Sequence, residues 1–150
     1  MSNEKRVVCL DDSRSVRLLL RAIFAGTSYR LLELDDGADP LVLVWRERPD
    51  VVVLDVAVWG LDGYELCRTL KSDPDTADIV VVMLTGRAQR ADRERGLAAG
   101  ADAYITKPFS PGALLERLNW LTARTQSSPG SRRPSAGDRQ KSGNGAGRQR

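Results

Sequence analysis

The stretch Val51-Val52-Val53-Leu54-Asp55 places a carboxylate directly after four consecutive apolar residues. A short, unbroken β-branched run is typical of a strand buried on both faces, as in a parallel sheet covered by helices. An unpaired carboxylate at the end of such a strand would be costly to bury, which favours a functional role for Asp55. The stretch therefore indicates both a fold class and a position for a site.

Four further apolar runs resemble this one in length and character, and segments of helical spacing separate them. They are residues 7–10, 31–34, 79–84 and 103–106. Strands that alternate with helices predict the α/β class. We expect a flavodoxin-like fold: a doubly wound (βα)5 domain with a five-stranded parallel sheet in the order 2-1-3-4-5.

The predicted helices differ in how firmly they should pack. Ser13 and Asp62 are candidate N-caps, and Ser110 followed by Pro111 predicts the start of the last helix. By contrast, residues 87–99 are rich in helix formers but poor in apolar residues. We expect this fourth helix to be the most exposed of the five.

The charge of the chain divides it into two unlike parts. Residues 1–123 hold 16 Lys and Arg against 19 Asp and Glu, whereas residues 124–150 hold seven against the single Asp138. From residue 126 onward the only apolar side chains are two alanines. We therefore expect one folded domain over 1–123 and a disordered basic tail over 124–150. The tail is interpreted as a solvated extension or as a weak contact for nucleic acid or another polyanion, although it lacks aromatic residues for base stacking.

Composition also excludes several classes of function. The chain has no His, which excludes His-based acid-base catalysis and metal sites that need imidazole. Cys9 and Cys67 lie within apolar runs and predict small buried side chains of a reduced protein. No apolar run approaches the about 20 residues that span a bilayer, and residues 1–6 resemble no secretory signal. We expect a cytoplasmic protein without membrane contact.

Polar side chains collect at the carboxyl ends of the predicted strands, where open α/β sheets bind ligands. Asp11 and Asp12 follow the first strand, Asp55 the third, Thr85 ends the fourth, and Lys107 follows the fifth. Three carboxylates that share one pocket invite a hard divalent cation such as Mg²⁺. A cation, a hydroxyl and an ammonium around a carboxylate nucleophile are the parts of a phosphoryl-transfer site.

Each of these signals also has a simpler structural interpretation. Asp11 and Asp12 alone would suit an ordinary helix cap, and Thr85 a β-branched strand end. Lys107-Pro108 suits either a plain loop or a cis peptide bond. Tyr104 alone is more typical of a core residue than of a switch.

Four motifs in order make the sequence resemble the receiver domains of two-component response regulators over roughly residues 5–123. They are LDDS at 10–13, VLD at 53–55 with GLDG at 60–63, LTG at 84–86, and GADAYITKPF at 100–109. The resemblance implies that Asp55 accepts a phosphoryl group from a histidine kinase or phosphotransfer protein. It implies that Asp11, Asp12, Asp55 and the backbone carbonyl of Ala57 hold Mg²⁺, and that Lys107 pairs with the phosphoryl oxygen.

The resemblance further implies a switch at Thr85 and Tyr104. Phosphorylation would then alter contacts with a downstream protein through the face formed by the fourth helix, fifth strand and fifth helix. Such a domain catalyses only its own phosphoryl transfer and autodephosphorylation. Because no second domain is evident, we expect a stand-alone signalling protein.

Two departures and two alternatives remain. Trp59 stands where the family usually has Pro, which predicts a less constrained loop, and Gly86 stands where Ala is frequent. A receiver-like scaffold that works without phosphorylation is one alternative. The other is a phosphohydrolase of the haloacid dehalogenase type. The second acid such enzymes need, two residues after the nucleophile, is missing, since Ser13 and Ala57 occupy those positions.

Overall fold

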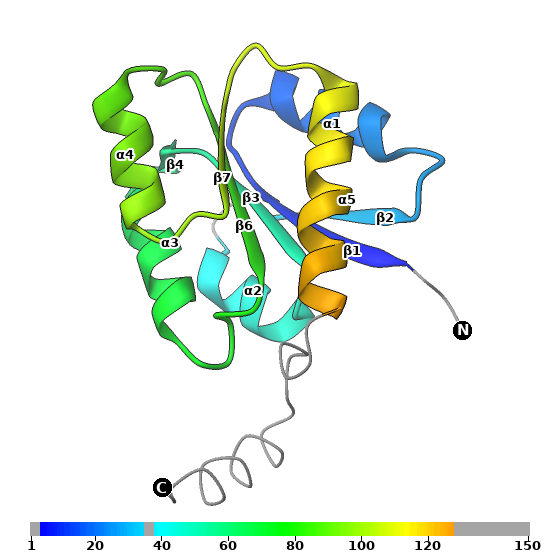
Figure 1. Cartoon of the computed structure of the whole chain (residues 1–150), viewed down its shortest axis with the longest axis horizontal. Helices are drawn as coiled ribbons and strands as arrows, with labels where there is room; N and C mark the ends of the chain where they lie inside the picture. Colours follow the sequence, from blue (N-terminus) through cyan, green and yellow to red (C-terminus); the bar gives the residue numbers. More distant parts are fainter. Residues whose placement is uncertain (1–3, 35–37, 128–150) are drawn as a thin grey trace, which may run out of the picture.

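A computed structural model describes residues 4–34 and 38–127. Within these ranges, the main strands are β1 (Lys5–Leu10), β2 (Tyr29–Glu33), β3 (Val51–Leu54), β6 (Val80–Thr85) and β7 (Ala103–Thr106). The helices are α1 (Arg14–Phe24), α2 (Pro40–Glu47), α3 (Gly63–Ser72), α4 (Arg90–Ala98) and α5 (Pro111–Ser127). The strands are all parallel and lie in the order β2-β1-β3-β6-β7, which confirms the predicted flavodoxin-like fold (Figure 1).

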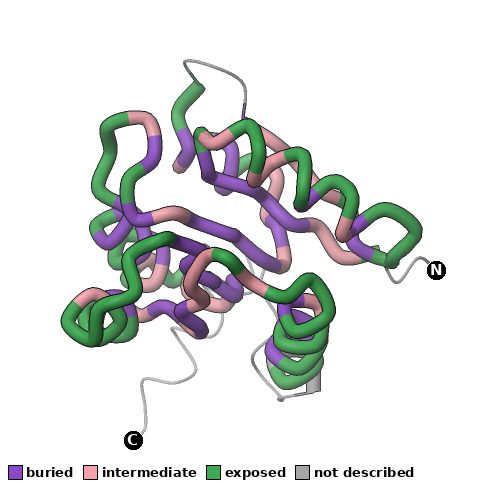
Figure 2. Tube along the Cα trace, turned by 90° about the horizontal axis from the view of Figure 1, so that it is seen from above, coloured by how far each residue is buried: buried purple, intermediate pink, exposed green. Residues whose placement is uncertain are grey.

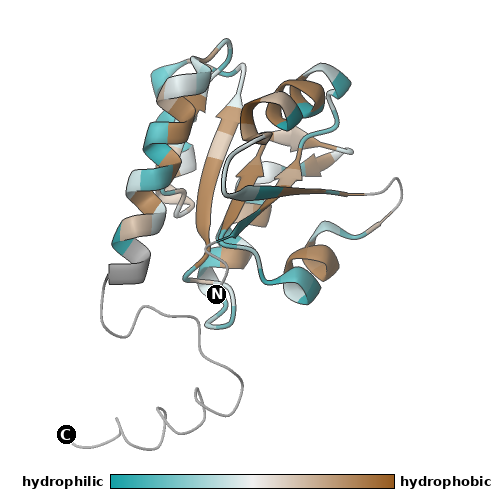
Figure 3. Ribbon diagram, turned by 90° about the vertical axis from the view of Figure 1, so that its right-hand side faces the viewer, coloured by the Kyte–Doolittle hydropathy of each residue, from teal (hydrophilic) through white to brown (hydrophobic). Residues whose placement is uncertain are grey.

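The sheet separates two apolar layers because its central strands are buried on both faces. Val8 and Leu10 of β1 face a cluster that includes residues of α2 and α3. Val7 and Cys9, which alternate with them, face a cluster built from α1 and α5. Figures 2 and 3 show the result as buried, hydrophobic strands between helices whose outer faces are exposed and polar.

Side-chain caps provide hydrogen-bond acceptors for free backbone N–H groups at the start of three helices. The Ser13 hydroxyl accepts a hydrogen bond from the Val16 N–H, and the Asp62 carboxylate accepts one from the Tyr64 N–H. Ser110 accepts from the Ala113 N–H at the start of α5. These three caps were expected from the sequence.

A short antiparallel hairpin follows β3 and was not expected. It consists of β4 (Ala57–Val58) and β5 (Leu61–Asp62), joined by Trp59 and Gly60. Both turn residues have positive φ, 48° and 76°, as a tight primed hairpin turn requires. The sequence predicted a loop less constrained than one with Pro; in the structure a two-residue turn joins its two strands, and Trp59 packs against the core.

Several boundaries differ from expectation by one to four residues, and two of the differences have a clear meaning. β2 begins at Tyr29, two residues earlier than expected, because Tyr29 pairs with Lys5 of β1. α5 continues to Ser127, so residues 124–127, which the sequence placed in the tail, are helical. The remainder of that tail lies outside the described residues, as do Asp35 and Asp36. Among the described helices, none is long and apolar enough to cross a membrane.

Candidate functional site

Lys107 joins two carboxylates from different strands at the carboxyl edge of the sheet. Its Nζ donates to Asp11 Oδ2 at 2.9 Å and to Asp55 Oδ2 at 3.3 Å. Asp11 follows β1, Asp55 follows β3 and Lys107 follows β7, so the parallel sheet alone brings them together. The sequence placed these three residues in one pocket, and the structure does the same.

Asp11 is fully buried, and its carboxylate is held on both oxygens. Oδ1 accepts from the Ser13 N–H at 2.9 Å, and Oδ2 accepts from Lys107. Burial raises the pKa of Asp11, while the bonds from Ser13 and Lys107 oppose that rise. For Lys107 the balance is reversed. Burial alone would lower its pKa, but Asp11 and Asp55 outweigh burial and raise the pKa overall.

Asp55 is held more openly than Asp11. Its Oδ1 accepts from the Val56 N–H at 2.7 Å, and its own N–H donates to the Leu10 carbonyl at 3.2 Å. Its side chain keeps 19% of its surface exposed, against 1% for Asp11. Of the two carboxylates that contact Lys107, Asp55 is thus the one that an external molecule can reach.

The hairpin after β3 positions the third carboxylate. Asp12 is exposed, and its Oδ2 accepts from the Trp59 N–H at 2.9 Å. Proline, which the family usually has here, carries no N–H and could not make this bond. Ala57, whose carbonyl the resemblance assigned to the metal, lies in β4 of the same hairpin, two residues after Asp55.

The donors suit Mg²⁺ by chemistry, since three carboxylates and one ammonium leave a net negative charge and hard oxygen ligands. In residues 4–34 and 38–127, however, no three carboxylate, thiol or imidazole side chains converge as ligands. Lys107 lies between Asp11 and Asp55, and Asp12 is turned toward the hairpin. The carboxylates are therefore of the type that binds Mg²⁺, and in this arrangement the Lys107 ammonium holds Asp11 and Asp55 together.

The two residues expected to switch lie on the side of the site nearest α4. Thr85 is buried, and its hydroxyl accepts from the Arg87 N–H at 3.3 Å. Tyr104 is also buried, and its hydroxyl donates to the Arg87 carbonyl at 2.8 Å. The Tyr104 ring is therefore already turned inward in this structure. The Lys107–Pro108 bond is cis, one of the two alternatives that the sequence left open.

Gly63 is a site residue that the sequence motif contained but whose role sequence reasoning missed. An added Cβ at Gly63 would overlap the backbone carbonyl oxygen of Asp55, and its N–H donates to the Val56 carbonyl at 2.5 Å. Only glycine allows the start of α3 to approach the backbone at the end of β3 this closely. The sequence signal for this role was that Gly63 follows Asp55 by eight residues. That spacing indicates a close approach only once the hairpin between the two residues is known.

Comparison with known proteins agrees with this geometry. Residues 7–119 match the family described as the response regulator receiver domain. The response regulator MprA of Mycobacterium leprae is 42% identical over 121 residues, 81% of this chain and 52% of that protein. A probable transcriptional regulator, ycf27 of Cyanophora paradoxa, is 39% identical over 83% of this chain and 51% of its own length. The chain thus spans about half the length of these relatives.

Solved structures show the same fold. A putative response regulator from Chloroflexus aurantiacus matches with a TM-score of 0.75 and 29% identity, covering 81% of this chain and 99% of that one. The receiver domain of the sensor histidine kinase PA1611 from Pseudomonas aeruginosa matches with a TM-score of 0.71 and 25% identity over 80% and 98% of the two chains, and its magnesium ion is coordinated in the active-site cleft. With the acid pair, the strand-end aspartate and the lysine in place on this fold, the chain belongs to the response regulator receiver domains of two-component systems.

Proposed function

We propose that Asp55 is the phosphoacceptor of a two-component phosphorelay and that its phosphorylation changes protein contacts. The observation that carries this proposal is the placement of Lys107 against both Asp11 and Asp55. Asp55 follows a fully buried strand yet remains partly exposed. This combination supports in-line attack on a phosphorus atom by a carboxylate held in a fixed position.

Asp11, Asp12, Asp55 and the carbonyl of Ala57 would hold Mg²⁺, which neutralises charge on the transferred phosphoryl oxygens when it is bound. Lys107, whose Nζ lies 3.3 Å from Asp55 Oδ2, adds a positive charge beside the same carboxylate. In the transfer, one carboxylate oxygen of Asp55 bonds to phosphorus while the bond from phosphorus to the leaving atom of the donor breaks. With a histidine kinase or phosphotransfer protein, the leaving atom is an imidazole nitrogen of that partner.

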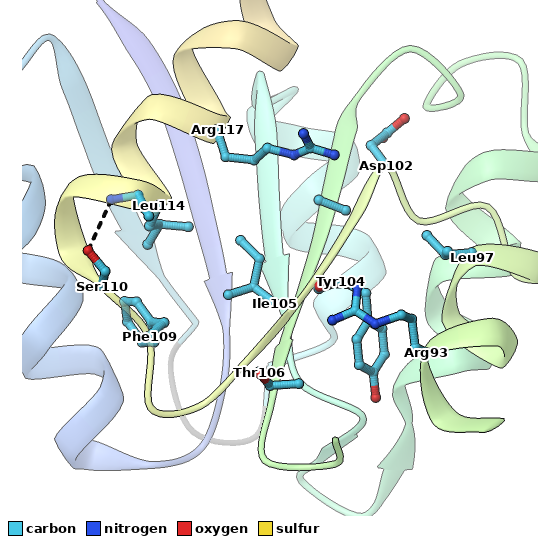
Figure 4. A pocket seen from close by; sticks show the side chains of 12 residues that line it. Arg93, Leu97, Asp102, Tyr104, Ile105, Thr106, Phe109, Ser110, Leu114 and Arg117 are labelled. Carbon is cyan, nitrogen blue, oxygen red and sulfur yellow. Dashed lines mark hydrogen bonds between the residues drawn. The ribbon is translucent and has the colours of Figure 1, made fainter. Parts of the chain in front are cut away.

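A downstream protein would bind the face formed by α4, β7 and α5. A hollow of about 490 Å³ lies between them, and Figure 4 shows Arg117 near the apolar Ile105 and Leu114, with Arg93 beside Tyr104 on the α4 side. Thr85 and Tyr104 border this region, and both contact the backbone of Arg87. A change at Thr85 would therefore alter the surface that a downstream protein meets.

Acetyl phosphate tests the acceptor directly. With Mg²⁺, the protein should gain the mass of one phosphoryl group while acetate leaves, and Asp55→Asn should abolish the gain. Asp39→Asn is the matched control, because Asp39 caps α2 and Asn caps equally well. Gain by Asp55→Asn would overturn the assignment. No gain by the unmodified protein would favour a scaffold that acts without phosphorylation.

A further inference from the structure

α4 is the helix of this fold with the smallest buried face. Gly96 is its one buried residue, and its N-cap, Gln89, makes no side-chain capping bond. The helix sequence, RADRERGLA, holds three arginines and two acids. Contacts other than an apolar stripe must therefore keep α4 against the sheet.

Two arginines of α4 each stack on a different buried tyrosine. The guanidinium of Arg93 lies 5.4 Å from the ring centre of Tyr104, and its Nη1 donates to the Tyr104 carbonyl at 3.1 Å (Figure 4). The guanidinium of Arg95 lies 4.3 Å from the ring centre of Tyr64 and 3.5 Å from Asp62. One pair joins α4 to β7, and the other joins it to the start of α3.

Tyr64 reaches α4 a second time through its hydroxyl. This group donates to the Asp92 carbonyl at 3.3 Å, and the ring is almost fully buried. Tyr64 and Tyr104 belong to the same buried cluster, and burial and, after it, the Tyr64 hydroxyl raise the pKa of Tyr104. Gly96 makes room there, since an added Cβ would lie 2.6 Å from the Tyr104 ring.

Tyr64 directly follows Gly63, the residue that packs against the backbone of Asp55. Gly63 packs on the Asp55 carbonyl and donates to Val56, and Asp62 accepts from the Tyr64 N–H. A backbone shift at Asp55 or Val56 would therefore move the start of α3. The Tyr64 ring and the Asp62 carboxylate would carry that movement to Arg95.

We propose that Tyr64 and Arg95 are positioning residues that couple Asp55 to α4, by a route that starts at Gly63 rather than at Thr85. This inference rests on the proposed phosphorylation of Asp55. It assigns α4 two attachments to the site, one on each side. The attachment on the α3 side would move with the backbone of Asp55 and Val56. The attachment on the β7 side would move with the loop that follows Thr85.

The test uses the full chain in Mg²⁺ with and without beryllofluoride, a phosphoryl mimic, followed by amide NMR. The unmodified protein should change at residues 11, 12 and 55 and across 90–98. Arg95→Ala should keep the first changes and lose at least half of the second. Arg95→Lys, which keeps the charge beside Asp62, should restore part of the loss. Arg90→Ala is the control, because Arg90 is exposed and pairs only within α4, with Glu94.

Amide hydrogen exchange without beryllofluoride tests the attachment itself. Arg95→Ala and Tyr64→Phe should each speed exchange across α4 about fivefold relative to Arg90→Ala, the loss expected for one cation–π or hydrogen-bond contact. If Arg95→Ala matches Arg90→Ala in both measurements, the inference is wrong while the proposed function stands. If beryllofluoride leaves the NMR signals of residues 11, 12 and 55 unchanged in the unmodified protein, both the proposed phosphorylation and its coupling to α4 are wrong. Amide hydrogen exchange would then still show whether Tyr64 and Arg95 hold α4 in place.

Discussion

α3 and α4 both flank the site, yet they are held in opposite ways. Five residues of α3 are buried, its N-cap Asp62 is bonded, and its first residue, Gly63, packs on the acceptor strand. α4 has one buried residue and an unbonded cap. The site therefore has a fixed wall of β1, β3 and α3 and a weakly held wall formed by α4.

This difference follows from the two sequences. Tyr64, Leu66, Cys67 and Leu70 give α3 an apolar face, and burying each such side chain contributes about 1.5–3 kcal/mol. α4 has Leu97 in its last turn, and that side chain is 47% exposed. A helix with so little buried surface opens at low free energy, so its position responds to small changes in its few contacts.

The largest expected effect comes from adding a methyl group in the fixed wall. Gly63→Ala should lower the free energy of unfolding by about 3 kcal/mol, because neither the Asp55 carbonyl nor the Val56 backbone can move aside cheaply. It should also reduce phosphoryl gain at Asp55. Urea unfolding measures the first effect and mass spectrometry the second.

Gly112→Ala is the matched control for that variant. Nothing lies within 4 Å of an added Cβ at Gly112, which lies in the first turn of α5. The change should therefore raise stability by about 0.5–1 kcal/mol. If Gly63→Ala behaves like Gly112→Ala, the close approach at Asp55 does not hold α3 in place.

A methyl group in the weakly held wall should have a smaller effect. Gly96→Ala brings a Cβ against the Tyr104 ring, but both the ring and α4 can shift, and Ala favours the helix by about 1 kcal/mol. We expect a net loss of about 1 kcal/mol in urea unfolding and altered NMR shifts at Tyr104. A loss as large as that of Gly63→Ala would show that α4 is as fixed as α3.

A side-chain N-cap added to α4 should make this helix more stable and so more like α3, which Asp62 caps. Gln89 has the extended backbone of an N-cap, with φ −70° and ψ 152°, but lacks a capping bond. Gln89→Ser should supply one, and the gain of about 0.5–1 kcal/mol should slow hydrogen exchange in α4 about threefold. Gln89→Ala should leave exchange unchanged, and equal slowing by both variants would exclude capping as the cause.

The smallest effect concerns the two thiols. Burial raises the pKa of Cys9 to about 12 and that of Cys67 to about 11, so at pH 8 both stay protonated in the folded state. The Cys67 thiol donates to the carbonyl of Ala99, just after α4, at 3.6 Å. Opening of α4 should therefore expose Cys67 first, and peptide mass spectrometry should find it alkylated several times faster than Cys9. Equal rates would mean that both thiols become accessible only when the whole domain unfolds.

The parts of this molecule that the sequence predicted are those that depend on residue type alone. Short apolar runs predicted all five main strands, and a parallel sheet then necessarily brings Asp11, Asp55 and Lys107 to one edge. The bond from the Trp59 N–H to Asp12 depends on a positive φ at Trp59, and two-residue strands show no periodicity. The stacking of Arg95 on Tyr64 depends on the angle between two helices, which no sequence spacing reports.

The bond between Lys107 and Asp11 joins residues 96 positions apart, and the bond to Asp55 spans 52. Among the strands that the structure describes, β7, which carries Lys107 into the site, is the last along the chain and pairs with β6 alone. During synthesis, a ribosome must therefore release nearly the whole domain before the acceptor aspartate meets its ammonium partner. The contact on which the proposed phosphorylation rests therefore forms only after nearly all of the domain has been made. An incomplete or misassembled chain would carry Asp55 without its positively charged partner.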